Sequence, residues 1–429
     1  MSDSNAARTL RAAEVFTPTK IPQYTYIDRH LEKKRKSLHD ALEEGSKAVS
    51  LSGPSKSGKT VFIEKELGKD CLIPVNGAGI DDCNVLWDRV FSIIGTPIQV
   101  KQSTKKANTG NIKQGAEVNL GVMKLSAGYD DSDTVESVME SKYAVDPLAL
   151  IIKELGNSGM VLFIDDFHYI AKDAQARISE QIKDAISKGV HIILASVPYH
   201  SDDAVRKNPD LRGRLVTLDF DYWGEDELKE IAVLGFNALN IEIDESTLMA
   251  FASEAAGSPQ LMQAICLNAC REAGYNSKQE TKVMLPNAHT VTENGQRFIE
   301  NVCSRTVEGA NHSSIVEKMK DGPKTRGNER KTYKILGEEG EFDVYPLIVK
   351  AFASDPPALQ FRYRNLLERL DKLCGMDSGP GGSSVSGACK FIADIANGAD
   401  GVNLLEWDSE NEVMNILDPY LLFFIRWGD

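Results

Sequence analysis

The chain has 429 residues, of which 42% are hydrophobic and 26% charged, and it is long enough to form about two or three globular domains. Its formal net charge of −14 argues against a polybasic protein that binds duplex nucleic acid mainly by neutralising phosphates, although a single face can still be basic. No apolar run approaches the roughly 20 residues of a membrane span, and the N-terminus lacks the apolar centre of a signal peptide, so we expect a cytoplasmic protein with no membrane partner. Its seven cysteines occur without a Cys-x-x-Cys pair, and we expect them to be reduced thiols.

The first half of the chain alternates between amphipathic helices and short apolar strands. The helices are predicted at 28–44, 59–67, 81–94 and 148–155, and a further one ends at Gly189. The strands are predicted at 47–52, 71–75, 160–164, 191–197 and 215–220. This alternation predicts βαβ units and a mostly parallel sheet covered by helices.

Residues 100–135 interrupt this pattern with a segment rich in Lys, Thr, Gly, Asn and Ser. Apolar residues alternate at 118–122 and again at 123–129, one step out of phase. A bulged hairpin insertion and a mobile surface excursion both fit this composition.

After Trp223 the strand signal fades, and helices are predicted at 225–240, 246–256 and 260–273. Residues 276–340 are mixed and polar, with a basic cluster between Lys324 and Lys334. The last part is predicted to contain helices at 363–373 and 386–396, a flexible Gly/Ser stretch at 378–384 between them, and a hairpin wing at 404–417.

The segment between the first predicted strand and the following helix matches the pattern G-x-x-x-x-G-K-[ST]. It consists of Gly53, Pro54, Ser55, Lys56, Ser57, Gly58, Lys59 and Thr60. In such a loop the glycines let backbone N–H groups point at phosphates, and the helix adds the partial positive charge of its N-terminus. We expect Lys59 to reach the β- and γ-phosphates of a nucleoside triphosphate and the Thr60 hydroxyl to hold Mg²⁺. Val61, the next residue, is also expected to bind the nucleotide.

Two acids, Asp165 and Asp166, follow the apolar strand 160–164 and form a Walker B pattern. Asp165 is expected to hold Mg²⁺, directly or through water, and Asp166 to orient or deprotonate the attacking water. Asp166 stands where many ATPases carry Glu, so its shorter side chain predicts slow turnover, which suits a switch better than a motor. Ser196, near the end of the strand 191–197, is expected between the two motifs, where it either contacts the γ-phosphate or the water or simply packs as a small residue.

Three arginines cluster near the end of the same region: Arg206, Arg212 and Arg214. An arginine finger that acts on a neighbouring subunit can raise the rate of phosphoryl transfer by about 10³–10⁵, and it would require the protein to assemble. Salt bridges to the aspartates at 202, 203 and 210 are the alternative role.

With these motifs in register, the chain resembles P-loop ATPases of the AAA+/STAND group. Gly257-Ser258-Pro259 is similar to the Gly-x-Pro of STAND lids, and Arg214 is similar to an AAA+ arginine finger. The final Leu417-Asp418-Pro419-Tyr420 and Arg426-Trp427 resemble the ending of prokaryotic STAND-like ATPases. Gln260 stands where AAA+ lids carry an arginine, which favours the STAND branch.

The resemblance implies an α/β fold: a P-loop NTPase core with a parallel sheet flanked by helices, followed by an α-helical lid and a C-terminal winged-helix domain. The expected divisions are an N-terminal arm and helix at 1–45, the core at 46–221 with its insertion at 100–135, the lid at 222–275, a linker or helical segment at 276–340 and the winged helix at 341–429. The resemblance also implies that Pro259 lies at the nucleotide and that residues 26–29 contact adenine.

The function implied is a slow, Mg²⁺-dependent ATPase that acts as a nucleotide-controlled switch, with roles in signalling or defence. Its partner would be another copy of itself or a separate effector or sensor protein. The alternatives are an origin-recognition-type ATPase that loads or remodels DNA and a scaffold that binds nucleotide without using hydrolysis. Nucleic acid is not the favoured partner, because the helix 386–396 carries only Lys390 as a cation and the wing at 406–412 is acidic.

Overall fold

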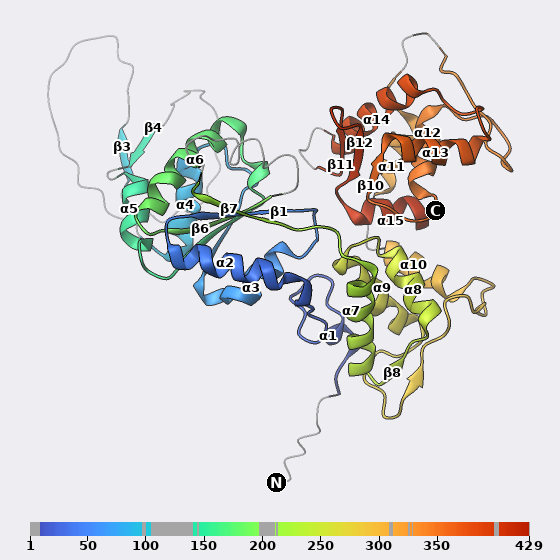
Figure 1. Cartoon of the computed structure of the whole chain (residues 1–429), viewed down its shortest axis with the longest axis horizontal. Helices are drawn as coiled ribbons and strands as arrows, with labels where there is room; N and C mark the ends of the chain where they lie inside the picture. Colours follow the sequence, from blue (N-terminus) through green and yellow to red (C-terminus); the bar gives the residue numbers. More distant parts are fainter. Residues whose placement is uncertain are drawn as a thin grey trace, which may run out of the picture.

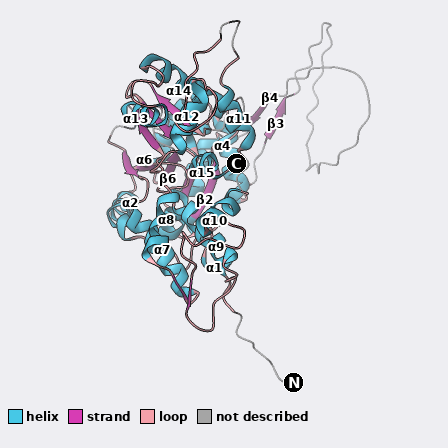
Figure 2. Cartoon of the chain, turned by 90° about the vertical axis from the view of Figure 1, so that its right-hand side faces the viewer, coloured by secondary structure: helices cyan, strands magenta, loops and turns pink. Residues whose placement is uncertain are grey.

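The computed structural model describes residues 9–96, 146–196, 211, 213–308, 312–324, 327, 329–398 and 403–428, together with the backbone of residues 100–103 and 140–143. These residues form three units: a sheet unit, a helical unit and a C-terminal unit of helices and short strands (Figure 1). The view in Figure 2 shows the C-terminal unit above the helical unit. Among the described residues no helix is both long enough and apolar enough to cross a bilayer.

The sheet unit is built on five parallel strands. They are β1 (Ala48–Ser52), β2 (Leu72–Asn76), β5 (Val161–Asp165), β6 (His191–Ser196) and β7 (Leu215–Asp219), in the order β2-β5-β6-β1-β7. Ser52 lies in register with Ser196 and Asp219, and Asn76 with Asp165. The register therefore collects the polar last residues of the strands at one edge of the sheet, which confirms the predicted parallel α/β core.

Alternating side chains bury both faces of this sheet. On β5, Val161 and Phe163 join the core beneath η1 (Arg29–Leu31), α2 (Glu32–Glu44) and α3 (Lys59–Leu67). Leu162 and Ile164 join the core beneath α4 (Cys83–Ile94), α5 (Pro147–Leu155) and α6 (Lys172–Ser187). Helices thus cover the sheet on both sides (Figure 1), as the continuous apolar strand predicts.

One short strand begins at the predicted start of the insertion, and a second begins five residues beyond its predicted end at 135. β3 (Val100–Ser103) pairs antiparallel with β4 (Glu140–Tyr143), from Val100 opposite Tyr143 to Ser103 opposite Glu140. The alternating pattern expected at 118–129 lies outside the described residues.

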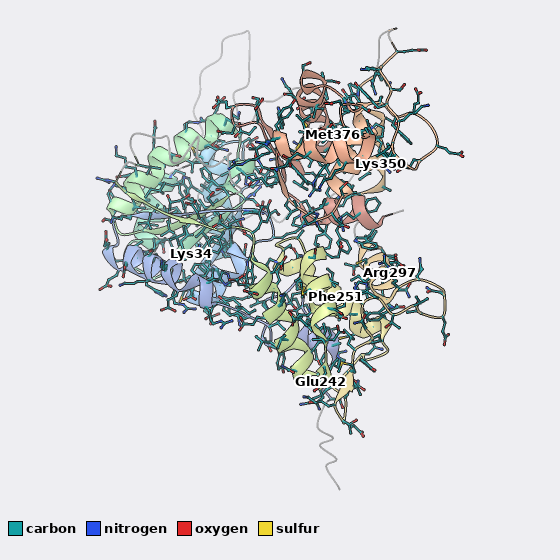
Figure 3. The ribbon with its side chains drawn as sticks, turned by 45° about the vertical axis from the view of Figure 1, so that its right-hand side comes forward. Lys34, Glu242, Phe251, Arg297, Lys350 and Met376 are labelled. Atoms are coloured by element: carbon teal, nitrogen blue, oxygen red, sulfur yellow. The ribbon has the colours of Figure 1, made fainter. Side chains whose placement is uncertain are left out.

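The helical unit contains more of the chain than the three helices predicted after Trp223. Its elements are α7 (Glu225–Ala238), β8 (Ile241–Glu242), α8 (Glu245–Glu254), α9 (Pro259–Glu272), β9 (Val283–Met284) and α10 (Phe298–Val307). The N-terminal α1 (Ala12–Val15) and Phe16 pack into the same hydrophobic core, whose centre includes Phe251 (Figure 3).

The C-terminal unit begins with α11 (Ser313–Asp321), whose Val316 and Met319 share a core with the helices that follow. Those elements are α12 (Val344–Ala353), β10 (Gln360–Arg362), α13 (Tyr363–Cys374), α14 (Gly382–Asn397), β11 (Leu405–Asp408), β12 (Val413–Ile416) and α15 (Pro419–Trp427). The strands form an antiparallel sheet in the order β10-β12-β11. The prediction of a flexible stretch at 378–384 is wrong at its C-terminal end, because Gly382–Ser384 form the first turn of α14.

We predict that Phe16→Ala lowers the free energy of unfolding of the helical unit by about 3–5 kcal/mol. The Phe16 ring is 0% exposed and meets the Phe236 ring edge to face at a centroid distance of 5.0 Å, so its removal opens a cavity. Urea unfolding followed by circular dichroism measures the change. Tyr24→Ala is the matched control, because Tyr24 is 44% exposed in the same arm; an equal loss in both variants would contradict the packing described.

Candidate functional site

The loop of residues 53–60 leaves the carboxyl end of β1 and enters α3, as its sequence pattern predicts. Gly58 has φ of 97°, a left-handed conformation that favours glycine. Gly53 passes so close to Phe220 that a Cβ at this position would lie 2.5 Å from the Phe220 carbonyl oxygen. The two glycines therefore allow the loop to curl tightly beside the end of β7.

Lys59 is held inside the curl of this loop. Its Nζ donates hydrogen bonds to the carbonyl oxygens of Gly53 at 2.7 Å and Pro54 at 2.8 Å, and the residue is only 9% exposed. Burial lowers the pKa of Lys59 to about 8, against the opposing effect of the carboxylates of Asp165 and Asp166. A bound anion would counter this cost of burying the ammonium group.

Ser57 provides a second reason to expect an anion in the loop. Its Oγ is buried, and none of the described residues hydrogen-bonds to it. Buried hydroxyls normally have a partner, and a phosphate oxygen would supply one. The residues present therefore fit the polyphosphate predicted from the sequence.

Thr60 and Asp165 join the two sequence motifs. The Thr60 hydroxyl donates to Asp165 Oδ2 at 2.7 Å, across 105 positions of sequence. Burial raises the pKa of Asp165, while the Thr60 hydrogen bond opposes that rise. A cation at this position would relieve the cost of burying the carboxylate.

The pair fits Mg²⁺ in the way that phosphate-binding enzymes hold it. Mg²⁺ prefers oxygen ligands and is usually bound through one or two carboxylates, substrate phosphates and water. Among the residues that the structure describes, no group of three His, Cys, Asp or Glu could hold a metal alone. Thr60 and Asp165 would supply the protein ligands, and phosphate and water the others.

Asp166, the expected water-orienting acid, is held by a residue that sequence reasoning missed. The amide Nδ2 of Asn76 donates to Asp166 Oδ2 at 3.0 Å, while Asn76 Oδ1 accepts from the Ala78 N–H at 2.8 Å. Asp166 itself has φ of 54°, a left-handed conformation uncommon for a residue with a side chain. Asn76 thus fixes the direction of a carboxylate that sits on a strained backbone.

Arg89, on α4, supports the end of β2 and the turn that follows it. Its Nη1 donates to the carbonyl oxygens of Asn76 at 2.6 Å and Ala78 at 2.8 Å. The only sequence signal for Asn76 is a polar residue at the end of a strand. That signal becomes specific only once β2 is known to lie beside β5.

Ser196 lies in the middle of the same edge. β6 stands between β1 and β5, and the buried Ser196 Oγ donates to the carbonyl oxygen of Leu51 at a long 3.4 Å. Its position is the one expected from the sequence, between the two motifs. Contact with a γ-phosphate stays a prediction, and it would require Ser196 to replace this weak hydrogen bond.

Arg214 lies at the opposite edge of the sheet. It precedes β7, and its carbonyl oxygen accepts from the N–H of Ala48, the first residue of β1. The five residues of β1 therefore separate the exposed Arg214 from the phosphate loop of its own chain. A role for Arg214 in hydrolysis requires it to reach a neighbouring copy; Arg206 and Arg212 lie outside the described residues.

Trp223 connects the loop to the helical unit. Its indole N–H donates to the carbonyl oxygen of Ser57 at 3.0 Å, and its backbone N–H donates to Gly257 at 2.9 Å. Gly257 is followed by Ser258, the N-cap of α9, and by Pro259, the first residue of that helix. The expected Gly-x-Pro segment is therefore tied to the phosphate loop through Trp223.

The segment before α2, whose residues 26–29 are expected to contact adenine, leads into His30, which packs against Trp223. The ring of His30 meets that of Trp223 at a centroid distance of 4.4 Å, and both His30 ring nitrogens are buried without a hydrogen-bond partner among the described residues. Tyr26 lies beneath the Lys65 ammonium of α3, at 5.0 Å from the ring centroid. Tyr26 therefore places this segment against the later part of α3, while Val61, near the start of that helix, is half-buried.

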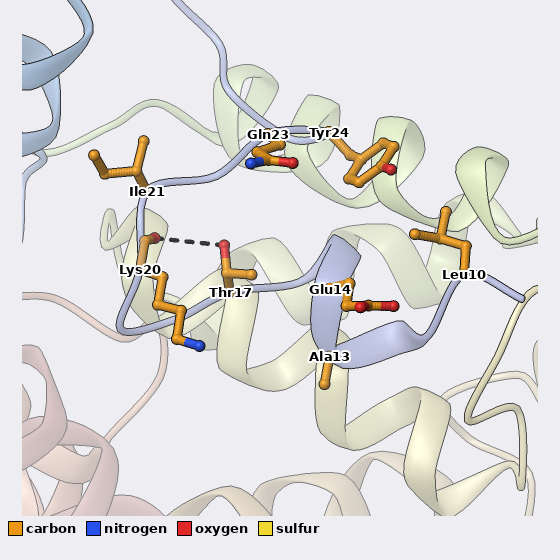
Figure 4. Close-up of a pocket in the computed structure, with 8 residues that line it drawn as sticks. All are labelled: Leu10, Ala13, Glu14, Thr17, Lys20, Ile21, Gln23 and Tyr24. Atoms are coloured by element: carbon orange, nitrogen blue, oxygen red, sulfur yellow. Dashed lines mark hydrogen bonds between the residues drawn. The ribbon is translucent and has the colours of Figure 1, made fainter. Parts of the chain in front are cut away.

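A separate pocket lies away from the phosphate loop, between α1 and the loop after it (Figure 4). It is lined by Leu10, Ala13, Glu14, Thr17, Lys20, Ile21, Gln23 and Tyr24. The Thr17 hydroxyl bonds to the carbonyl oxygen of Lys20 inside it. Among its residues, Leu10 packs against the core of the helical unit, whereas Ala13, Lys20, Gln23 and Tyr24 are exposed.

Comparison with known proteins supports the fold. Neither a protein-family model nor a curated protein matches the sequence. Among solved structures, the Walker-type ATPase PABY2304 of Pyrococcus abyssi matches with a TM-score of 0.50 at 14% identity, over 96% of this chain and 100% of that one. The fold is that of a P-loop NTPase.

Two further structures have lower scores. The ORC2 protein of Aeropyrum pernix, solved with ADPNP and ADP, has a TM-score of 0.48 at 12% identity, and Cdc6p from Pyrobaculum aerophilum has 0.44 at 13%. Each covers 98% of both chains. At such identities the likeness is one of fold alone.

We predict that Asn76→Ala lowers ATP turnover by about tenfold or more while the affinity for ATP changes less than twofold. The reason is that Asp166 loses the amide that fixes its carboxylate, whereas the phosphate loop is untouched. Phosphate release and calorimetric titration measure the two quantities. Asn84→Ala, at an exposed position of α4, is the control, and an equal loss of turnover in it would contradict the role of Asn76.

Proposed function

We propose that the protein is a Mg²⁺-dependent ATPase that hydrolyses ATP slowly and acts as a nucleotide-controlled switch. The observation that carries the proposal is the Thr60–Asp165 hydrogen bond, which joins the phosphate loop to the acidic strand end. The buried Lys59, which donates hydrogen bonds to two carbonyl oxygens of the loop, supplies the cation that such a site needs. The P-loop fold agrees with this chemistry without requiring it.

Each residue of the site has a role in this proposal. The N–H groups of residues 53–60 bind the phosphates, and Lys59 neutralises the β- and γ-phosphates. Thr60 and Asp165 hold Mg²⁺, which when bound offsets the charge that develops on the transferred phosphate. Asp166, directed by Asn76, orients the attacking water or takes its proton.

ATP is favoured over GTP mainly by the resemblance to the AAA+/STAND group. The adenine would lie near residues 26–29 and Val61. His30 adds support through its place, because its ring packs on Trp223 at a centroid distance of 4.4 Å and Trp223 is hydrogen-bonded to the phosphate loop. Burial lowers the pKa of His30, so the ring is neutral near pH 7 and one of its nitrogens is a hydrogen-bond acceptor.

The switch would work through the units around the site. Pro259 and Trp223 would transmit the nucleotide state to the helical unit, which then acts as the lid of STAND-like ATPases. We infer that α12 to β12 form a winged helix, from their order of helix, strand, two helices and a two-stranded wing.

Assembly with another copy would bring Arg214 to a neighbouring site, and a separate effector or sensor protein is the other candidate partner. Seven free cysteines, six of them buried, support a cytoplasmic location.

A second candidate function is a DNA-binding ATPase of the origin-recognition type. The winged-helix order of the C-terminal unit favours it, because such units often read duplex DNA. Its charge argues against it: Lys390 is the exposed cation of α14, and Asp408, Glu410 and Glu412 lie at the wing turn. Salt-dependent duplex binding that stimulates hydrolysis would replace the switch by this function.

The proposal predicts different results for two substitutions. Lys59→Ala should weaken ATP binding at least about 100-fold, because the buried ammonium is lost. Asp166→Asn should bind ATP as the wild type does and hydrolyse it at least about 100-fold more slowly. Calorimetry and phosphate release separate the two effects. No ATP binding by the wild type with Mg²⁺ would exclude the proposed function, and unchanged turnover in Asp166→Asn would reduce it to a nucleotide-binding scaffold.

The switch itself predicts a change of mass or shape with nucleotide. Size-exclusion chromatography with light scattering should distinguish the nucleotide-free form from the form with an ATP analogue, while Lys59→Ala remains in the nucleotide-free form. Identical mass and elution volume in all states would contradict a switch that works through assembly. A wild-type turnover of tens per second or faster would contradict slow hydrolysis.

A further inference from the structure

The side chain of Lys56, in the middle of the phosphate loop, is bound to the C-terminal unit. Its Nζ donates to Asp418 Oδ1 at 2.5 Å and lies 4.5 Å from the ring centroid of Tyr420. These partners are 362 and 364 positions away in the sequence, at the start of α15. The most distant part of the chain therefore contacts the loop that would bind phosphate.

Asp418 has two functions at the start of α15. As the N-cap, its carboxylate accepts the N–H of Tyr420 at 2.9 Å. Its other oxygen lies 3.9 Å from His312 Nε2, beyond hydrogen-bond distance. Among the described residues, Lys56 is thus the one cation that donates a hydrogen bond to this carboxylate.

The far end of α15 is fixed to the helical unit. Arg426 Nη2 donates to Glu254 Oε1 at 2.8 Å, Nε donates to Oε2 at 3.1 Å, and the two side chains are only 8% and 11% exposed. The Trp427 indole N–H donates to Glu254 Oε2 at 2.7 Å. Phe423, between these two ends, is buried in the core of the helical unit, whereas Leu421 and Leu422 are buried in that of the C-terminal unit.

The two ends of α15 differ in strength. Arg426 contacts Glu254 through two nitrogens in a nearly dry environment, a geometry in which an ion pair is hard to break. Lys56 and Asp418 are 27% and 16% exposed and share one hydrogen bond, so water and ions can compete for it. The contact with the phosphate loop is therefore the one that yields first.

A triphosphate in the loop acts directly on this weaker contact. Its negative charges would enter the loop whose Lys56 is hydrogen-bonded to the Asp418 carboxylate, and like charges repel more strongly at a partly buried site than in water. The same phosphates offer Lys56 another anionic partner. Nucleotide binding and the docked position of α15 therefore oppose each other.

We propose that Asp418 is an autoinhibitory latch: it holds α15 on the phosphate loop through Lys56 and releases it when a triphosphate binds. This inference rests on the proposed nucleotide binding of the loop. Because Arg426 and Phe423 keep α15 on the helical unit, its release from the phosphate loop lets the helical and C-terminal units shift together against the sheet unit. The final residues of the chain thereby couple the nucleotide site to the position of two units.

The test compares Asp418→Asn with the matched control Asp343→Asn. Asn caps a helix as well as Asp does, so each variant keeps its cap and loses only a charge. Asp343 caps α12 and pairs with Arg330 at 2.6 Å, inside the C-terminal unit and not with the phosphate loop. By calorimetry with ATP and Mg²⁺, Asp418→Asn should bind about five- to tenfold more tightly than the wild type, and Asp343→Asn within twofold of it.

Hydrogen exchange without nucleotide gives an independent readout. In Asp418→Asn the amides of residues 53–62 and of the first turn of α15 should exchange faster than in the wild type, and ATP should produce the same increase at α15 in the wild type. Unchanged exchange at α15 in Asp418→Asn, or unchanged ATP affinity, would overturn the latch. Failure of every form to bind ATP would instead refute the proposed function, and the exchange comparison would still decide whether Asp418 holds the loop.

Discussion

Charge burial at the carboxyl edge of the parallel sheet is the constraint on which the remaining features of the site depend. Parallel pairing brings Asn76, Asp165, Ser196 and Ser52 to the same edge of the sheet, where β1 continues into the loop of Lys59. Burial lowers the pKa of Lys59 and raises that of Asp165, because both lose water. Burying these charged groups therefore costs free energy of hydration, and a bound polyphosphate and its metal would offset that cost.

The three units meet around this edge through a small number of directional contacts. Trp223 joins the helical unit to the phosphate loop, and the Tyr222 hydroxyl donates to the carbonyl oxygen of Ile416 in the C-terminal unit at 3.2 Å. Both residues belong to the short connection between β7 and α7. A change at the phosphate loop thus has a short path to both other units, through adjacent residues of one segment.

The N-terminal segment has a structural role that its sequence does not reveal. Residues 12–16 complete the core of the helical unit, while Arg35 of α2 pairs with Asp28 at 2.6 Å and with Glu66 of α3 at 2.8 Å. Arg29 also pairs with Glu230 of α7. The segment therefore spans the sheet unit and the helical unit, beside the region where we propose that the base binds.

The elements and motifs that depend on neighbouring residues could be predicted from the amino-acid sequence. The strands and helices of the sheet unit, the loop 53–60 and the acids after β5 follow from local periodicity and spacing. The structure has their bounds within one or two residues of the prediction, except that the first helix is α-helical only from Glu32 and not from 28. Which distant groups meet depends on the tertiary structure. The strand order puts Asn76 beside Asp166 and puts Arg214 at the other edge, and the packing of α15 puts Asp418 on Lys56. These contacts join residues 90 and 362 positions apart, and their partners are chosen by the burial of whole faces, which no local pattern encodes.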